Sequence, residues 1–253
     1  MIAVIGGNGF LGSMLSNDLK GKKILRNNLD SITQTHWNQI IIAAPTGNRL
    51  MVGNNSVQDF NDCRAIVESM QKATYDHLIY ISTVDVYQEK TSVDDNLTAQ
   101  EPAHSYGKNR HFLERSLSAF DRCHVVRLPS LCHPTIKKNI LFDLSSSQWL
   151  DKISLDSHVQ WYPIKKLAHD IDWAIKSGVP QINLVSPPIS NRQIIQTYFP
   201  ELVDNLSSNS VQSQRYNVRT SYSDSGYWIS ESEIWKSFTE FFQSTRNIAT
   251  NSL

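Results

Sequence analysis

Ile2-Ala3-Val4-Ile5-Gly6-Gly7-Asn8-Gly9-Phe10-Leu11-Gly12 is the stretch that decides the fold of this chain. It predicts a buried strand, a glycine turn and the start of a helix. In dinucleotide-binding turns the first glycine allows a sharp exit from the strand, the second lets backbone N–H groups approach a pyrophosphate, and the third lets the helix pack closely. We expect Gly6, Gly9 and Gly12 to fill these roles, and Phe10 and Leu11, at the positive end of the helix, to contact the bound dinucleotide. The alternative is a glycine-rich β-turn without a ligand.

Length and composition are those of an ordinary globular chain. A chain of 253 residues, 40% hydrophobic and 19% charged, can bury one domain core and a smaller appendage. Because 24 basic and 24 acidic residues cancel, bulk charge favours neither nucleic acid nor a membrane as a partner. No apolar run approaches the roughly 20 residues that cross a bilayer, and a strand beginning at residue 2 leaves no room for a signal peptide. We therefore expect a cytoplasmic protein.

The cysteines and histidines give no metal-binding pattern. Cys63, Cys123 and Cys132 are odd in number and lack ligand spacing, so we expect reduced thiols in the core. The histidines likewise show no pair spaced to bind a metal on one element.

The rest of the chain alternates strand-like and helix-like segments. This order predicts an α/β fold with a doubly wound, mainly parallel sheet of the Rossmann type and a smaller C-terminal substrate domain. We expect the dinucleotide-binding domain at 1–135 and the smaller domain at 136–253, with segments near 160–185 returning to the sheet. The short stretch between 27 and 38 predicts one shortened βα unit. The expected strands are 2–5, 23–25, 39–43, 77–82 and 124–128, and the expected helices are 11–20, 57–72 and 105–120.

Two further patterns suggest an active site. A buried strand ends in Ser82-Thr83, and Tyr106 follows in the segment Ser105-Tyr106-Gly107-Lys108-Asn109-Arg110. Together with the glycine turn, they resemble the extended short-chain dehydrogenase/reductase family, also called the NAD-dependent epimerase/dehydratase family. The resemblance implies that Thr83 orients a substrate oxygen and that Tyr106 exchanges a proton.

The resemblance extends over most of the chain. Ile42-Ala43-Ala44 resembles the family strand that ends beneath the cofactor, and Val125 to Pro129 resembles its next core strand. The resemblance implies that Ala43, Ala44 and Pro129 contact the cofactor. Trp161 to Ala168 and Ile182-Asn183-Leu184 resemble the segments that return to the sheet. The weakest part of the match is 204–224, a stretch rich in Ser and Asn that we expect to be a loop of the smaller domain.

Arg110 stands where the family has a lysine, four residues after the tyrosine. Positions i and i+4 share a helix face, so a positive charge is expected beside Tyr106. If the guanidinium of Arg110 lies about 5 Å from the ionised phenol of Tyr106, at an effective dielectric of about 20, the attraction between them is roughly 3 kcal/mol. This attraction predicts a lowered pKa for Tyr106. Lys108 is about 200° round the helix and cannot substitute. The guanidinium of Arg110 is longer and planar and never deprotonates. We therefore do not expect Arg110 to reproduce the contact that the family lysine makes with the cofactor ribose. The alternative is that Arg110 only pairs with a surface carboxylate.

Other departures narrow the chemistry. Family dehydratases follow the Thr with an Asp-Glu pair, whereas this chain has Val84 and Asp85, which disfavours sugar dehydration. We expect Asp85 to cap a turn rather than to act in catalysis. Where the family has an Asn and a later Gly-Pro, this chain has Ser130 and His133-Pro134. We therefore expect the base of the substrate pocket to differ from that of the family.

Cofactor choice depends on the end of the second strand, where an acidic residue binds the NAD ribose and a basic residue suits a 2′-phosphate. Arg26 is at this position and no acidic residue appears before Asp30, so NADP is favoured over NAD. The alternative is a solvated arginine at a strand end.

These inferences lead to two hypotheses. The first is an NAD(P)-dependent nucleotide-sugar epimerase or 4-keto-sugar reductase with Thr83, Tyr106 and Arg110 at its catalytic site, in which Tyr106 moves the proton. The second is a non-catalytic member that keeps the dinucleotide as a structural or sensing ligand. The expected partner is a small-molecule substrate, and the helices at 57–72 and 105–120 suggest a homodimer by the same resemblance.

Overall fold

The computed structural model describes residues 1–91, 93–95, 102, 104–207 and 210–250. The chain divides into two compact units. Unit 1 consists of Met1–Glu89, Asn96–Arg127 and Lys166–Ile182, and unit 2 consists of Lys90–Asp95, Leu128–Lys165 and Asn183–Leu253. The domain boundary expected at residue 135 stays a prediction.

Unit 1 is built on a six-stranded sheet of the order β2-β1-β3-β4-β5-β9. The strands are β1 (Ile2–Ile5), β2 (Lys22–Ile24), β3 (His36–Ile42), β4 (Thr74–Thr83), β5 (Cys123–Leu128) and β9 (Gln181–Asn183). β1 pairs in parallel with β2 and β3, and β3 pairs in parallel with β4. Ala3, Val4 and Ile5 of β1 are buried, as expected for a central strand with helices on both faces of the sheet.

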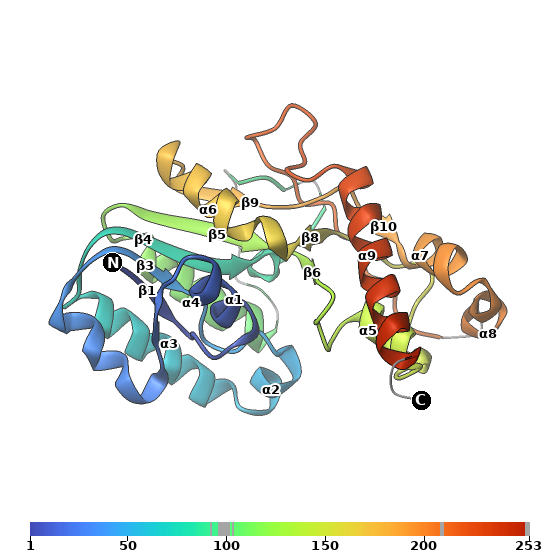
Figure 1. Cartoon of the computed structure of the whole chain (residues 1–253), viewed down its shortest axis with the longest axis horizontal. Coiled ribbons are helices and arrows are strands. Elements are labelled where there is room, and N and C mark those ends of the chain that lie inside the picture. Colours follow the sequence, from blue (N-terminus) through green and yellow to red (C-terminus); the bar gives the residue numbers. More distant parts are fainter. Residues whose placement is uncertain (92, 96–101, 103, 208–209, 251–253) are drawn as a thin grey trace. The chain divides into compact units, whose positions relative to one another are not determined.

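Helices cover both faces of this sheet, as in a Rossmann fold. α1 (Phe10–Asp18) contacts α6 (Leu167–Lys176), whereas α3 (Ser56–Met70) contacts α4 (Ser105–Leu117). Figure 1 shows α6 and α3 on opposite sides of the sheet. A short helix, α2 (Arg49–Asn54), precedes α3, and 3-10 turns follow β4 (η2, Val84–Val86) and precede α6 (η4, Ile164–Lys166). The doubly wound α/β fold is thereby confirmed.

The shortened βα unit is also confirmed. Between β2 and β3 the chain forms only a 3-10 helix, η1 (Arg26–Gln34), interrupted by non-helical angles at Asn28. The unit still contributes to the core, because Trp37 is buried and its indole N–H donates to the carbonyl of Ile32 at 2.9 Å.

The five expected strands and three expected helices of unit 1 are all present, with shifted ends. β3 begins at His36 rather than at residue 39, and β4 begins at Thr74 rather than at residue 77. Both extensions pair with each other, His36 opposite Thr74. The polar residues at these ends therefore complete a ladder that hydrophobic patterning does not show.

Unit 2 contains two small sheets and a helical layer. β6 (Ser130–Cys132) pairs with β8 (Trp161–Pro163), and β7 (His158–Val159) pairs with β10 (Ile189–Ser190). Its helices are α5 (Ile140–Ser146), η3 (Leu150–Lys152), α7 (Asn191–Tyr198), η5 (Pro200–Leu202), α8 (Val203–Ser207) and α9 (Glu231–Thr250). The ring of Phe238 in α9 packs edge-on against that of Trp161, with centroids 5.0 Å apart. The stretch expected to be a loop, 204–224, contains part of α8, and residues 208–209 lie outside the described residues.

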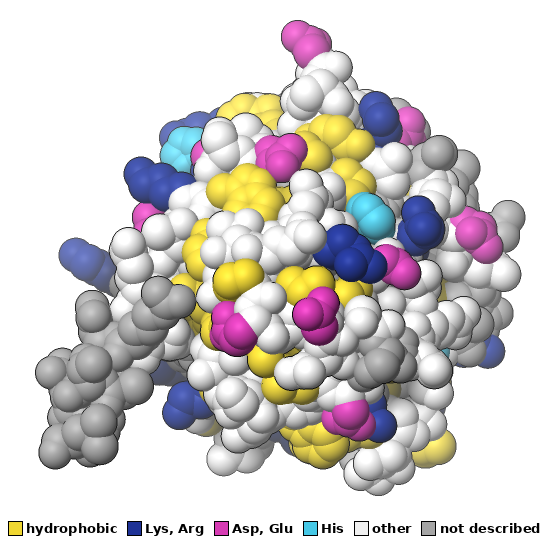
Figure 2. All heavy atoms as spheres, turned by 90° about the vertical axis from the view of Figure 1, so that its right-hand side faces the viewer, with side chains coloured by type: hydrophobic (Ala, Val, Ile, Leu, Met, Phe, Trp, Pro, Cys, Tyr) yellow, Lys and Arg dark blue, Asp and Glu magenta, His cyan; other side chains and the backbone are white. Residues whose placement is uncertain are grey.

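Charged side chains of both signs are interspersed on the face drawn in Figure 2, as the balanced composition predicts. Among the described helices, none has the length and apolar character that a bilayer-spanning segment needs.

Candidate functional site

The glycine turn has the tight geometry that its sequence predicts. Gly6 has φ of +84°, and its N–H donates to the carbonyl of Ile24 at 2.9 Å. A Cβ at Gly12 would lie 2.1 Å from the Gly6 carbonyl oxygen, so only glycine lets α1 approach this closely. Gly9 is the N-cap of α1, and no side chain makes a capping hydrogen bond there in the described structure. Because the first N–H groups of a helix need acceptors, this end suits an anion.

A hollow of about 400 Å³ adjoins the turn. It is lined by Gly6, Asn8, Gly9, Leu25, Arg26 and Asn27. The glycine turn and the end of β2 thus form one concave surface, which is where a Rossmann fold binds the ribose and pyrophosphate of a dinucleotide. A Cβ at Gly9 would meet only the Gly6 carbonyl oxygen, at 3.2 Å, and would otherwise project into open space. The residues present therefore fit a dinucleotide.

The other residues expected to contact a cofactor are distributed between the units. The N–H of Ala43 donates to the carbonyl of Ile5 at 2.9 Å, which sets Ala43 and Ala44 beside the start of the glycine turn. The Cβ of Ala44 would be 2.9 Å from a Cβ at Gly6. Pro129 belongs to unit 2, so its cofactor contact stays a prediction.

Thr83 and Tyr106 are brought together at the carboxyl end of β4. Thr83, the last residue of the strand, and Tyr106, in the first turn of α4, lie close enough for the Thr83 hydroxyl to influence the Tyr106 phenol. Thr83 also caps the turn η2, since its hydroxyl oxygen accepts from the N–H of Asp85 at 3.2 Å. Two hydroxyl groups are thus held together at the edge of the sheet where α/β enzymes bind their ligands.

Gly107 explains how α4 can approach this edge. A Cβ at Gly107 would lie 2.5 Å from the carbonyl oxygen of Asp85, so any larger residue would push the first turn of α4 away from the end of β4. His104 fixes the same turn, because its Nδ1 accepts from the N–H of Gly107 at 2.9 Å. The tyrosine is therefore positioned by the residues on either side of it.

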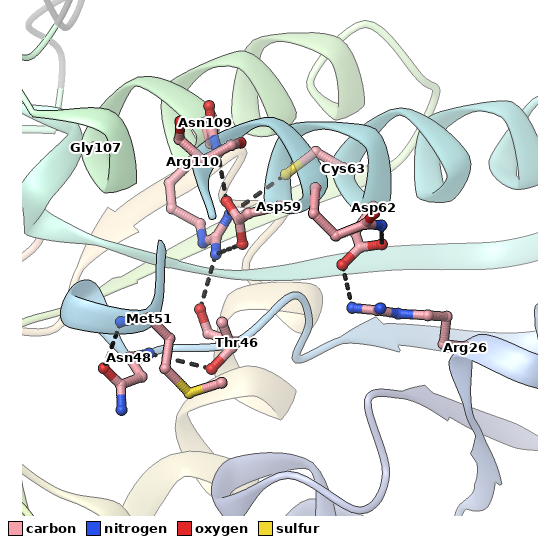
Figure 3. A network of polar contacts seen from close by, with 12 residues as sticks. Arg26, Thr46, Asn48, Met51, Asp59, Asp62, Cys63, Gly107, Asn109 and Arg110 are labelled. Atoms are coloured by element: carbon pink, nitrogen blue, oxygen red, sulfur yellow. Dashed lines mark hydrogen bonds and ion pairs between the residues drawn. The ribbon is translucent and has the colours of Figure 1, made fainter. Parts of the chain in front are cut away.

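Arg110 lies one turn further along α4, and its guanidinium is held in a buried network (Figure 3). Nη1 and Nη2 donate to the two carboxylate oxygens of Asp59 at 3.0 and 2.7 Å. Nη2 also donates to the carbonyl of Thr46 at 2.8 Å. Arg110 is 3% exposed and Asp59 is 5% exposed. The structure therefore agrees better with the alternative, in which Arg110 pairs with a carboxylate, than with a free cation beside Tyr106. The carboxylate is, however, buried and not on the surface.

This network changes the expected electrostatics of Tyr106. The guanidinium carbon of Arg110 lies 4.9 Å from the centre of the tyrosine ring. Even so, the pKa of Tyr106 is raised, because burial disfavours the phenolate more strongly than Arg110 stabilises it; Asp85 adds to the rise. The expectation of a lowered pKa is therefore wrong. It left out the desolvation of the phenol and the negative charge of Asp85.

Asp85 has a different contact from the one expected. Its buried carboxylate pairs with Arg49, at the start of α2, and the cap of the η2 turn is Thr83. The pair lies near the tyrosine, since both charges act on the pKa of Tyr106.

Arg26 is exposed and pairs with a carboxylate on α3. Its guanidinium contacts Oδ2 of Asp62, and its side chain is 73% exposed. Arg26 is therefore not simply a solvated residue at a strand end.

The three cysteines are free thiols. Cys63 and Cys132 are buried and Cys123 is half-buried. Burial raises the pKa of the Cys63 thiol to about 12, and its sulfur lies 3.3 Å from Nη1 of Arg110. These thiols are protonated core groups, as expected.

Sequence reasoning missed Asp59 and Asp62, the partners of the two arginines. They are three residues apart on α3, so they lie on adjacent parts of one helix surface. The local signal is weak, because Asp59 and Asp62 are two of the three acidic residues on the helix expected at 57–72. Their arginines are 51 and 36 residues away in the sequence.

Comparison with known proteins supports the fold assignment. No protein-family model matches the sequence, and no curated protein matches it. MoeE5 in complex with UDP-glucose and NAD has a similar structure, with a TM-score of 0.76, 11% identity, and coverage of 98% of this chain and 99% of that one. RMD from Pseudomonas aeruginosa complexed with NADPH matches with a TM-score of 0.71 and 13% identity over 97% and 99% of the two chains. The dTDP-4-dehydrorhamnose reductase from Yersinia enterocolitica matches with a TM-score of 0.69 and 16% identity over 96% and 99%.

These similarities show that the chain has the Rossmann-type fold found in epimerases and reductases that act on nucleotide sugars. The neighbours are of the kind that the sequence resemblance implies.

Proposed function

We propose that this protein is an NAD(P)-dependent reductase of a nucleotide-linked keto sugar, with Tyr106 as the proton donor. The observation that carries the proposal is the proximity of Thr83 and Tyr106 at the end of β4, in the same unit as the glycine turn. The similarity to MoeE5 in complex with UDP-glucose and NAD, and to RMD complexed with NADPH, supports it.

The cofactor would be held by the glycine turn and the hollow beside it. Gly6, Gly9 and Gly12 allow the backbone to approach the pyrophosphate, and the first turn of α1 offers its N–H groups. When bound, a reduced nicotinamide supplies hydride to a carbonyl carbon.

The chain's own residues would manage the oxygen of that carbonyl. The hydroxyls of Thr83 and Tyr106 bind and orient it, and Tyr106 donates a proton to the oxygen as the carbonyl becomes an alcohol. With a raised pKa, Tyr106 is present at neutral pH as the phenol, the form that donates a proton, and its phenolate is scarce. Epimerisation also needs the reverse step, in which the phenolate removes a proton. Reduction is therefore favoured over epimerisation.

Arg110 contributes to this site as a positioning residue. Its contacts with Asp59 and Thr46 fix α4 against α3 and the segment that follows β3. It does not stand in for the family lysine as a free cation.

The test compares native protein with Tyr106→Phe. With NADPH or NADH and a panel of nucleotide-linked keto sugars, native protein should oxidise the cofactor. Tyr106→Phe should lose at least a hundredfold in kcat while binding the cofactor with unchanged affinity. Because the donor must be protonated, the native rate of reduction should stay constant through neutral pH and fall only at alkaline pH. Full activity in Tyr106→Phe would contradict the assignment.

The second candidate is a non-catalytic dinucleotide-binding protein. It is favoured by one observation, the capture of the Arg110 guanidinium by buried Asp59. Tight cofactor binding with no turnover of any keto sugar in the panel would support this candidate over the reductase.

A further inference from the structure

The pairing of Arg26 with Asp62 bears on cofactor choice. Arg26 lines the hollow at the end of β2, where a 2′-phosphate would be recognised. The partner, however, comes from α3, not from β2 or the residues that follow it. Arg26 is thus a cation whose charge is already balanced.

The position of Asp62 is fixed by two contacts. Its Oδ1 accepts from the side-chain amide of Gln58, one turn earlier on α3, at 3.0 Å, and its Oδ2 contacts Arg26. The Asp62 side chain is only 14% exposed. In contrast, the Arg64–Glu68 pair on the same helix is 58% and 60% exposed, with a separation of 3.5 Å. The carboxylate of Asp62 is therefore fixed in position and largely shielded from solvent, whereas Glu68 belongs to an exposed surface ion pair.

We propose that Asp62, by pairing with Arg26, lowers the affinity of this chain for a nicotinamide dinucleotide that carries a 2′-phosphate. The inference rests on the proposed function. A phosphate at the hollow would have to share Arg26 with Asp62, and it would stand beside the negative charge of Asp62. A free 2′-hydroxyl meets neither obstacle. Asp62 therefore moderates the preference for NADP that Arg26 alone predicts.

The experiment measures NADPH and NADH binding to the full chain by calorimetry. Asp62→Asn keeps the shape of the side chain and an acceptor for Gln58 but removes the charge. It should raise NADPH affinity about tenfold, or about 1.4 kcal/mol, and leave NADH affinity within about twofold. Glu68→Gln removes a charge from the same helix without touching Arg26, and it should leave both affinities unchanged.

A double variant identifies the route of the effect. Arg26→Gln in the Asp62→Asn background should abolish the gain in NADPH affinity, because it removes the cation among the described residues that line the hollow. An unchanged NADPH-to-NADH ratio in Asp62→Asn would overturn the inference, as would an equal gain in Glu68→Gln. Failure of the native chain to bind either dinucleotide would refute the proposed function itself, which is a distinct result.

Discussion

The buried pair of Arg110 and Asp59 gives a strong prediction about stability. Arg110→Met removes the guanidinium and leaves the carboxylate of Asp59, 5% exposed, without its cation. Breaking a buried ion pair from one side costs about 3–5 kcal/mol. The Nδ2 group of Asn109 still donates to Asp59 at 2.7 Å, which favours the lower end of that range. For a chain of this size, the midpoint of thermal unfolding should fall by about 6–20 °C.

The assay is urea unfolding followed by circular dichroism, with a matched surface variant. Arg64→Met removes an arginine from an exposed pair on α3 and should cost less than about 0.5 kcal/mol. In the double variant Asp59→Asn with Arg110→Met, neither charge remains. The loss should therefore be smaller than the sum of the two single losses, by about 2 kcal/mol. A loss below about 1 kcal/mol in Arg110→Met, or additive losses in the double variant, would refute the view that the pair holds α4 against α3.

Two other features of unit 1 predict measurable effects on stability. Gly12→Ala should destabilise the fold by about 1–3 kcal/mol in urea, since the new Cβ would lie 2.1 Å from the Gly6 carbonyl oxygen; a neutral result would contradict the close packing of α1. His124 is buried with Nδ1 on the Val179 carbonyl and Nε2 3.2 Å from His77, and its pKa is lowered, chiefly by burial. Because the folded state favours neutral His124, stability should be full above about pH 6.5 and fall as the pH is lowered toward 5. His124→Asn keeps a donor for the Val179 carbonyl and should make the free energy of unfolding less dependent on pH between about 5 and 6.5. An unchanged pH dependence would show that other groups cause it.

Much of the fold was accessible from the sequence, because its signals are local. Apolar runs and glycine turns mark the elements of unit 1, and the spacing of Thr83 and Tyr106 marks the end of β4 and the first turn of α4. Strand ends were harder to predict, since polar residues such as His36 extend the ladder without a hydrophobic signal.

The electrostatics of the site could not be predicted in the same way. The charge on Arg110 was evident from the sequence, but its partner is a carboxylate 51 residues away, and burial of the phenol outweighs its effect on the pKa of Tyr106. Arg26 is a similar case, because Asp62 reaches it from another element. Residue identity predicts which charges exist, whereas packing decides which of them are already paired.

Binding of a nicotinamide dinucleotide at the glycine turn is the claim on which the whole account depends, and calorimetry tests it directly. Native protein should bind NADPH or NADH. Gly9→Val should reduce that affinity at least tenfold, because the side chain would occupy the space that the pyrophosphate needs; the extended backbone of Gly9, with φ of −71° and ψ of 168°, can accept valine. Gly53→Ala, in α2, where a Cβ meets nothing within 4 Å, should bind like the native protein. No binding by native protein, or equal affinity in Gly9→Val, would contradict the account.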